Sequence, residues 1–105
     1  MFARHITLQL KPNFEKEFPI VFEKDIIPVL RRQKGFLEEL LLVTPFKNEA
    51  VAISLWEEKE NPEAYHKQVY PEFSKIIAKF VVEPPVVKMY EVEYATYRKF
   101  ATVTV

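Results

Sequence analysis

Residues 53–73 read ISLWEEKENPEAYHKQVYPEF and pass from a strand-like pattern to a helix-like one. Apolar residues alternate up to Trp56, which predicts a strand with side chains on two opposite faces. The acidic run 57–60 has the composition of a solvated turn. The sequence NPE at 61–63 then combines an N-cap residue, a proline at the first helical position and an acid, as helix starts commonly do. This stretch therefore predicts a strand, a turn and a helix in succession.

The chain that precedes this stretch begins with a predicted strand and an amphipathic helix. Residues 2–10 alternate between apolar and more polar positions, as a half-buried strand does. Over 14–30 the apolar residues recur every three or four positions, and Asn13 is placed to cap this helix. Pro19 and Pro28 lack the backbone N–H of a helix interior, so we expect them to kink the helix or divide it.

The remaining elements complete an antiparallel sheet. Strands are predicted at 36–44, 50–56 and 86–94, with a hairpin turn at 45–48 and a second helix from 61 to about 81 that is interrupted near Pro71. Gly35 ends the first helix. The order β-α-β-β-α-β predicts a ferredoxin-like α+β fold with both helices on one face of the sheet. We expect one domain over 1–105, with a tail at 94–105 whose weak alternation permits an extra edge strand.

Length and composition describe one globular domain and exclude several kinds of function. The 105 residues suit a single core, and 15 acidic residues balance 15 basic ones, which leaves no electrostatic footprint for nucleic acid. No apolar run approaches the roughly 20 residues of a membrane span, and the N-terminus lacks the apolar segment of a signal peptide. The chain has no Cys and a single Gly, which excludes thiolate chemistry and Gly-rich phosphate loops. We therefore expect a cytoplasmic protein with no nucleic-acid or membrane partner.

The two faces of the predicted sheet differ in polarity. The face that we expect the helices to cover carries Phe2, Ile6, Leu8, Val51, Ile53 and Leu55. The opposite face would carry His5, Thr7, Gln9, Ala52, Ser54 and Trp56, with Met89 or Tyr90 from the last strand. That set is too apolar for open solvent and too polar for a dry core. It predicts a homodimer whose two sheets enclose a cavity for a small aromatic or apolar ligand; the alternative is a monomer whose C-terminal tail folds over this face.

Four segments resemble the antibiotic biosynthesis monooxygenase family of the dimeric α+β barrel superfamily. These segments are MFARHITLQLKP, IIPVLRRQKGF, EAVAISLWEEKENPEAYHKQVYPEF and VVKMYEV, and together they span most of the chain to about Val92. The pattern Pro-x-Leu-x-x-Gln-x-Gly-Phe at 28–36, followed by a strand that ends in Trp-Glu, is similar to the family's usual layout. The resemblance implies a homodimer that forms a dimeric α+β barrel, has one pocket per subunit between sheet and helices, and uses dioxygen without a cofactor.

The haem-degrading branch of that family implies a different set of residues. It has an Asn on the first strand, an aromatic residue on the second helix and a haem-ligating His further along that helix. His5 and Tyr65 stand near the first two positions, whereas Lys75 and Ile76 stand at the third. His66 lies more than two turns too early to serve as that ligand. The quinol-oxidising branch uses Asn, Trp and Tyr-like groups near the pocket, and Trp56 matches it.

The candidate site residues follow from these patterns. His5 is the candidate base, because its ordinary pKa lies near neutral pH; the alternative is a histidine held by a hydrogen bond without chemistry. Trp56 and His66 are further catalytic candidates, against interface core for Trp56 and plain surface for His66. The candidate substrate-binding residues are Thr7, Gln9, Ser54, Tyr65 and Tyr90. Because neither His has a companion at metal-ligand spacing, we expect no metal site.

Three functions are compatible with the sequence. The first is a cofactor-independent monooxygenase that deprotonates a small aromatic or quinol substrate in the cavity of a homodimer, after which the anion reduces dioxygen. The second is a non-enzymatic dimer that binds a small molecule in the same cavity. The third, which rests on fold analogy, is a haem-binding or haem-degrading protein. Whether the chain is an enzyme stays open at this point.

Overall fold

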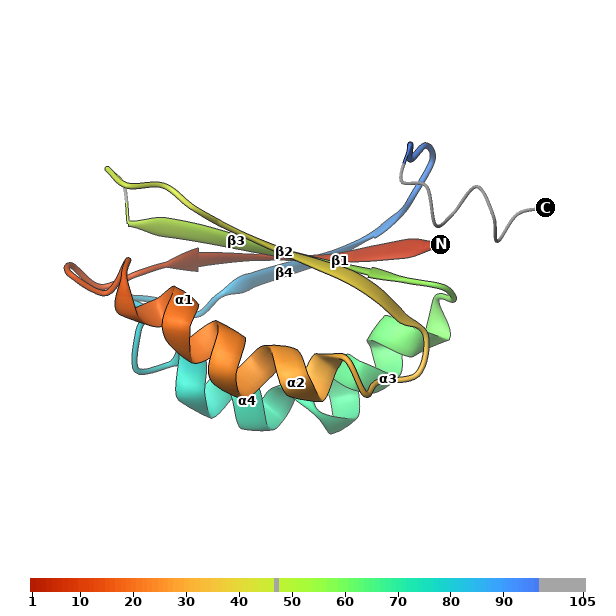
Figure 1. Cartoon of the computed structure of the whole chain (residues 1–105), viewed down its shortest axis with the longest axis horizontal. Helices are drawn as coiled ribbons and strands as arrows, with labels where there is room; N and C mark the ends of the chain where they lie inside the picture. The colour runs from red at the N-terminus through yellow and green to blue at the C-terminus, as the bar shows by residue number, and fades with distance from the viewer. Residues whose placement is uncertain (47, 97–105) are drawn as a thin grey trace.

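The computed structural model describes residues 1–46 and 48–96, and its elements follow the predicted order. They are β1 (Phe2–Gln9), α1 (Glu17–Val21), the π-helical η1 (Phe22–Ile26), α2 (Ile27–Leu30), β2 (Phe36–Val43), β3 (Glu49–Trp56), α3 (Glu60–Gln68), α4 (Tyr70–Ile77) and β4 (Val86–Glu91). The strands form one antiparallel sheet in the order β2-β3-β1-β4, and the helices cover one face of it (Figure 1). The predicted ferredoxin-like α+β fold is confirmed. Lys47 of the predicted turn and most of the predicted tail strand lie outside the described residues.

The first helical segment is divided, as its two prolines predict. Pro19 sits in the first turn of α1, where no N–H is needed. Pro28 offers no N–H to the Lys24 carbonyl, and the chain before it widens into η1, in which the Ile27 N–H bonds to the Phe22 carbonyl. The predicted cap is wrong, because α1 begins only at Glu17. Asn13 instead occupies a left-handed turn with a φ of 73°.

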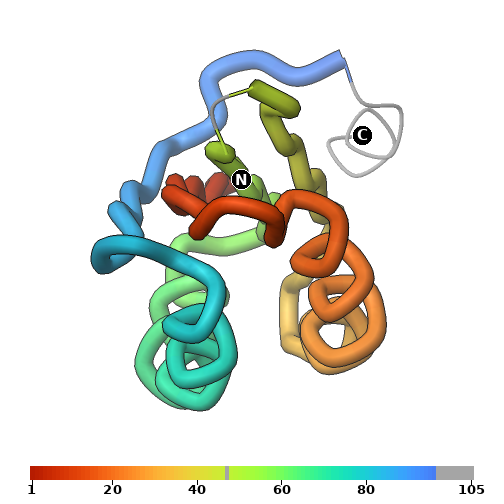
Figure 2. The backbone as a smooth tube through the Cα atoms, turned by 90° about the vertical axis from the view of Figure 1, so that its left-hand side faces the viewer, coloured from red at the N-terminus to blue at the C-terminus, as the bar shows by residue number. Residues whose placement is uncertain are grey.

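The second helical segment is also broken where proline predicts it. Val69 separates α3 from α4, and Pro71 lies in the first turn of α4. The helix starts at Glu60, so Asn61 is within the first turn, and its Oδ1 accepts the Glu58 N–H at 2.9 Å. Figure 2 shows the two helical segments as separate columns beneath the sheet.

The register of β3 reverses the predicted assignment of its faces. Ala52 pairs with Ile6 across the ladder, and Ala50 pairs with Leu8, so these residues share the face that the helices cover. Ser54 and Trp56 follow them by alternation and are buried. The prediction that Ala52, Ser54 and Trp56 face away from the helices, and that Val51, Ile53 and Leu55 face toward them, is therefore wrong.

Packing volume explains this reversal. The helices bring large aromatic side chains, among them Phe18, Phe22 and Phe73, onto the covered face of the sheet. Small residues at 50 and 52 of β3 leave the space that these rings fill. The branched side chains of β3 therefore lie on the outer face of the sheet. The strand pattern alone does not indicate that the outer face carries apolar residues.

The outer face of the sheet carries exposed apolar side chains, and no helix of the described residues covers it. Its exposed large side chains are Leu40, Leu42, Val86 and Tyr90, with 50%, 52%, 56% and 48% of their surface accessible. Val51, Ile53 and Leu55 lie between them and are half-buried. The outer residues of β1, among them His5 and Thr7, lie between the side chains of β3 and those of β4, so a more polar row crosses this face. Exposed apolar side chains gathered in this number are typical of an interaction site. Within the described ranges, no helix has the length and apolar character needed to cross a membrane.

The reversed faces of β3 can be tested by two neighbouring substitutions. Replacing Ala52 by Leu would push three extra carbons among buried helix side chains, and overpacking of this kind costs about 1–3 kcal/mol of unfolding free energy. Replacing Val51 by Leu on the outer face should change it by less than about 0.5 kcal/mol. Urea unfolding followed by circular dichroism measures both. Equal losses for the two variants would contradict the assignment.

Candidate functional site

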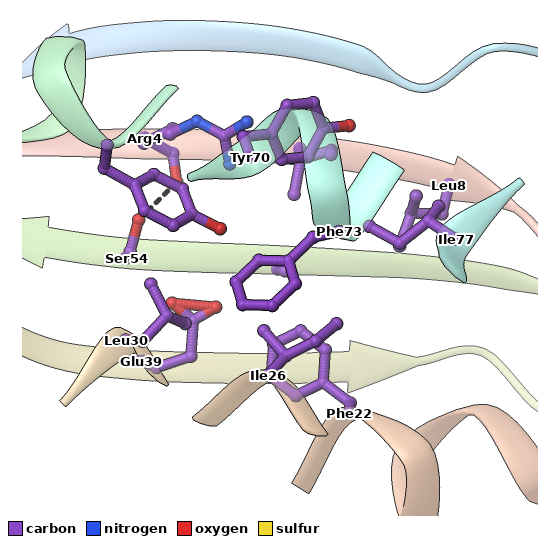
Figure 3. Close-up of a pocket in the computed structure, with 13 residues that line it drawn as sticks. Arg4, Leu8, Phe22, Ile26, Leu30, Glu39, Ser54, Tyr70, Phe73 and Ile77 are labelled. Carbon is purple, nitrogen blue, oxygen red and sulfur yellow. Dashed lines mark hydrogen bonds between the residues drawn. The ribbon is translucent and has the colours of Figure 1, made fainter. Parts of the chain in front are cut away.

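A pocket lies between the sheet and the helices, and its two ends differ in polarity (Figure 3). Helix residues supply apolar walls: Phe22, Ile26, Leu30, Phe73 and Ile77. The polar groups lie toward one end: Arg4, Glu39, Ser54, Tyr65 and Tyr70. A mostly apolar pocket with a few convergent polar groups is the usual form of a small-molecule site.

Three polar residues form a row across three adjacent strands on the covered face. Ser54 of β3 pairs with Arg4 of β1 on one side and with Glu39 of β2 on the other. The Ser54 hydroxyl donates to the Arg4 carbonyl at 3.5 Å and accepts from Trp56 Nε1 at 2.8 Å. Its hydrogen bonds are thus directed to the protein. Arg4 and Glu39 are left as the groups that can serve a ligand.

Arg4 is a buried cation without a carboxylate partner among the described residues. Only 4% of its surface is accessible, and its Cζ lies 4.3 Å from the Tyr70 ring centre and 5.1 Å from that of Tyr65. Nη2 lies 3.1 Å from His66 Nδ1; since a guanidinium can only donate, Nδ1 is the acceptor and the imidazole is neutral there. Nε is buried and has no hydrogen-bond partner within residues 1–46 and 48–96. Cation–π contacts offset part of the cost of burying this charge.

Burial and the Arg4 charge shift the pKa of His66, Tyr65 and Tyr70. Burial, and then Arg4, lower the pKa of His66, which agrees with a neutral ring that is stacked on Tyr70 at 5.2 Å between centroids. Burial raises the pKa of Tyr65 and of Tyr70, and Arg4 acts against burial in both cases. Both phenols are therefore hydrogen-bond donors at neutral pH.

Glu39 is held largely in its neutral form. Burial raises the pKa of this carboxyl from an ordinary 4.5 to about 8, although the Arg4 guanidinium lowers it. Its Oε1 is buried and has no hydrogen-bond partner among the described residues. In Figure 3 the carboxyl group points from β2 into the pocket, next to Leu30. A carboxyl that changes charge near pH 8 can accept or return a proton at physiological pH.

The structure brings some of the predicted site residues to this pocket. Ser54 and Tyr65 line it. Trp56 is completely buried behind it, with its ring 5.4 Å from Tyr65 and 5.5 Å from Phe36. His66 is exposed and does not line the pocket, but its Nδ1 accepts a hydrogen bond from Arg4, which does.

The other predicted residues lie on the outer face of the sheet. His5, Thr7 and Gln9 alternate away from the pocket, and Tyr90 pairs with Ala3 on the same side. His5 contacts Tyr90 edge to face at 6.1 Å. Gln9 Nε2 donates to Glu49 Oε2 at 3.0 Å. Any catalytic or substrate-binding function of these residues would therefore be on the outer face and not between the sheet and the helices.

Sequence reasoning missed Arg4, Glu39 and Tyr70. Alternation with Ile6 and Leu8 puts Arg4 on the covered face. A charged residue at a buried position often has a function, so the sequence alone could have identified Arg4. Tyr65 and Tyr70 are five positions apart and would lie on different faces of an unbroken helix, but α3 ends at Gln68 and α4 begins at Tyr70, and both rings line the pocket with centroids 6.4 Å apart. No cluster of three or more potential metal ligands occurs in the ranges that the structure covers.

The pocket is nearly closed in this conformation. About 20 Å³ is open to the centre of a water molecule, which is room for roughly one water. Tyr65 separates it from a wider surface cleft of about 330 Å³, whose lining includes Gln33, Lys34 and Gln68. A cavity that holds benzene measures about 150 Å³, so a ring-sized ligand requires the pocket to open. Tyr65 is the wall that the two spaces share.

The environment of Glu39 predicts a pH-dependent stability. Because its pKa is higher in the folded chain, folding binds a proton between about pH 4.5 and 8, and Glu39 lowers stability progressively as the pH rises through that window. Glu39→Gln, which mimics the neutral carboxyl, should therefore be more stable than the wild type at pH 8 by about 1–2 kcal/mol, discounted for partial solvent access. The difference should vanish at pH 4. Urea unfolding at both pH values measures it; a constant difference would refute the assigned environment.

Several solved structures share this fold, although no protein-family model matches the sequence and no curated protein matches it. A Streptomyces coelicolor monooxygenase from the gene ActVA-Orf6, in complex with nanaomycin D, has a TM-score of 0.78 at 14% identity over 90% of this chain and 88% of that one. A mutant of SnoaB, a cofactor-independent oxygenase from Streptomyces nogalater, has a TM-score of 0.75 at 16% identity over 92% of this chain and 97% of that one.

A third match is provisionally described as an antibiotic biosynthesis monooxygenase, from Nitrosomonas europaea. Its TM-score is 0.74 at 14% identity, over 90% of this chain and 100% of that one. Identities this low establish the architecture and not the reaction. The chain has the fold of the antibiotic biosynthesis monooxygenases.

Proposed function

We propose that the protein is a cofactor-independent monooxygenase that binds a small aromatic or quinol substrate between the sheet and the helices. The observation that carries the proposal is Arg4, a buried cation that lines the pocket and whose Nε–H has no hydrogen-bond partner among the described residues. A structural arginine would be expected to have its donors satisfied. Two proteins of the same fold, the S. coelicolor monooxygenase and SnoaB, support the reaction class by their described activities.

The pocket favours the anion of such a substrate. A phenol or quinol that becomes an anion in this pocket is attracted by Arg4 in a site that excludes water, where the Coulomb attraction is stronger than in solution. Deprotonation makes the ring electron-rich, and the carbanion form transfers an electron pair to dioxygen to give a hydroperoxide. Loss of water then leaves a carbonyl, so one oxygen atom enters the product and the other leaves as water. The protein's part is to bind, shield and stabilise the anion.

Substrate entry requires the pocket to open past Tyr65. This ring divides the closed pocket from the surface cleft, and it is held by packing on Trp56 and Phe73. Opening followed by closure would admit the substrate and then exclude water from the anion. Trp56, Ser54 and His66 support this site: Trp56 backs Tyr65, Ser54 holds the backbone of Arg4, and His66 orients its guanidinium.

The outer face fits a second copy of the chain. Leu40, Leu42, Val86 and Tyr90 form an apolar surface on which the matching surface of a second sheet would pack. In such a homodimer His5, Thr7 and Gln9 would lie at the interface. A catalytic role for His5 would be exercised there, in a space between the sheets. A cytoplasmic location remains a prediction.

Oxygen uptake tests the proposed reaction. With a panel of hydroquinones and hydroxylated naphthalenes, the wild type should consume dioxygen above the uncatalysed rate. Arg4→Met should lower kcat/KM by about 10²–10³, the usual cost of removing one donor to a developing anion. The exposed Arg31→Met is the matched control and should retain activity. An oxygen electrode and product analysis give the readout. No uptake by the wild type, with probe recovered unchanged, would favour a non-enzymatic binding protein.

His5→Ala locates the proton acceptor. Unchanged turnover would place this role on the pocket side of the sheet, because His5 lies on the other side. A large loss of turnover that leaves the dimer intact would instead support His5 acting between subunits.

Sedimentation tests the homodimer. Leu40→Glu would bury a charge in the apolar interface, and an unpaired buried charge costs several kcal/mol, so we expect a shift from dimer to monomer at micromolar concentration. Ile20→Glu is the control, since Ile20 is a comparably exposed apolar residue on α1. Circular dichroism checks that both variants fold. A wild type that sediments as a monomer at every concentration would refute the dimer.

A further inference from the structure

We infer that Arg4 and Glu39 hold opposite ends of one ligand, a planar ring with an acidic oxygen at Arg4 and a hydroxyl group at Glu39, and that Glu39 accepts the hydroxyl proton. This inference rests on the proposed function in one respect, namely that the pocket is the substrate site. It adds the class of substrate, a hydroxyaryl acid or a ring with two opposed oxygens. It also adds the residue that takes the proton.

The first support is the pair of unsatisfied atoms. Arg4 Nε is a donor and Glu39 Oε1 is an acceptor when ionised, and both are buried without a partner among the described residues. An ionised Glu39 and Arg4 in one pocket would be expected to pair with each other. Among the described residues, no ion pair within 4.0 Å joins them. Leaving both groups unpaired is costly, so the arrangement is explained if a ligand meets them together.

The second support is their placement. Arg4 and Glu39 stand opposite one another with Ser54 between them, so their backbones are separated by two strand spacings, roughly 10 Å. Figure 3 shows their side chains on either side of the pocket. Ser54 cannot bridge them, since its hydroxyl already bonds Trp56 and the Arg4 carbonyl. The space between the two charges suits a molecule with polar atoms at both ends.

The third support is the shape and character of the walls. Phe73 and Tyr65 flank the space, and η1 and α2 contribute only apolar side chains to it. Aromatic and aliphatic walls of this kind favour a flat, apolar body over a flexible polar one. Once the pocket opens, a ring would fit between these walls, and oxygens on its opposite edges would reach Arg4 and Glu39 at the polar end.

The proton transfer is balanced within the pocket. The ligand O–H bond breaks, an O–H bond forms on Glu39 Oε1, and the electron pair stays on the ligand oxygen. The neutral carboxyl can then donate a hydrogen bond back to that oxygen. Arg4 balances the negative charge that the ligand carries at its other end.

The groups that face Glu39 agree with this role. Arg4 from β1 favours its ionised form, whereas Glu38 from β2 disfavours it. Tyr65 and Tyr70, from α3 and α4, are neutral phenols at physiological pH. Because the pKa of Glu39 is about 8, the fraction of Glu39 that is ionised, which is the form that accepts the proton, increases as the pH rises. We expect kcat/KM to rise with pH through about 8 in the wild type.

Calorimetric titration under anaerobic conditions tests the ligand assignment. The probes are 4-hydroxybenzoate and 4-methoxybenzoate, which differ in the hydroxyl proton. At pH 8.5 the wild type should bind 4-hydroxybenzoate about tenfold more tightly, because the methoxy group leaves the Glu39 carboxylate unpaired. Glu39→Gln should reduce this ratio to about threefold or less, whereas Glu23→Gln, at an exposed carboxylate of η1 that does not line the pocket, should keep it. Arg4→Met should weaken both probes by about tenfold or more.

Several outcomes would overturn the inference. They are equal affinity of the two probes for the wild type, an unchanged ratio in Glu39→Gln, and no binding of either probe. Oxygen uptake separates this inference from the proposed function. Uptake by Glu39→Gln with the wild-type pH profile would remove the role of Glu39 and leave the monooxygenase standing. Probe binding as expected, without any oxygen uptake, would remove the monooxygenase and leave the ligand assignment standing.

Discussion

The burial of the Arg4 guanidinium is the constraint on which the site depends. Removing such a charge from water costs several kcal/mol, and no carboxylate among the described residues repays it by direct contact. Two tyrosine rings and one imidazole nitrogen surround it instead. These groups come from α3 and α4, on either side of the break at Val69. The need to surround one cation therefore links β1 to both halves of the second helical segment.

The burial of Arg4 also explains the row of polar residues Arg4, Ser54 and Glu39 across the sheet. Ser54 uses its hydroxyl to tie Trp56 to the Arg4 backbone, which fixes the floor of the pocket. Small residues on β3 admit the aromatic side chains of the helices and leave little free space. The Arg4 and Glu39 side chains are in place on this floor before any ligand enters, whereas the packed helix side chains above them must move to admit a ring.

Local patterns in the sequence predicted the elements well and the faces of one strand poorly. Helix breaks were predictable because proline acts through its own missing N–H, as at Pro28 and Pro71. The faces of β3 were not, because both sets of its side chains are apolar and only the register with β1 decides between them. Glu39 was harder still. The irregular pairing between Phe36 and Glu38 shifts the alternation of β2, so its facing residues cannot be counted from the start of the strand.

Trp56 gives the pocket an optical reporter of its own. It is the only tryptophan in the chain, it is fully buried, and its ring packs against Tyr65 at the pocket wall. Its fluorescence therefore comes from a single, water-free environment next to the site. An electron-accepting ring that enters the pocket would quench that emission, and a displacement of Tyr65 would change it. The emission of Trp56 would thus report a ligand in the proposed pocket without an added label.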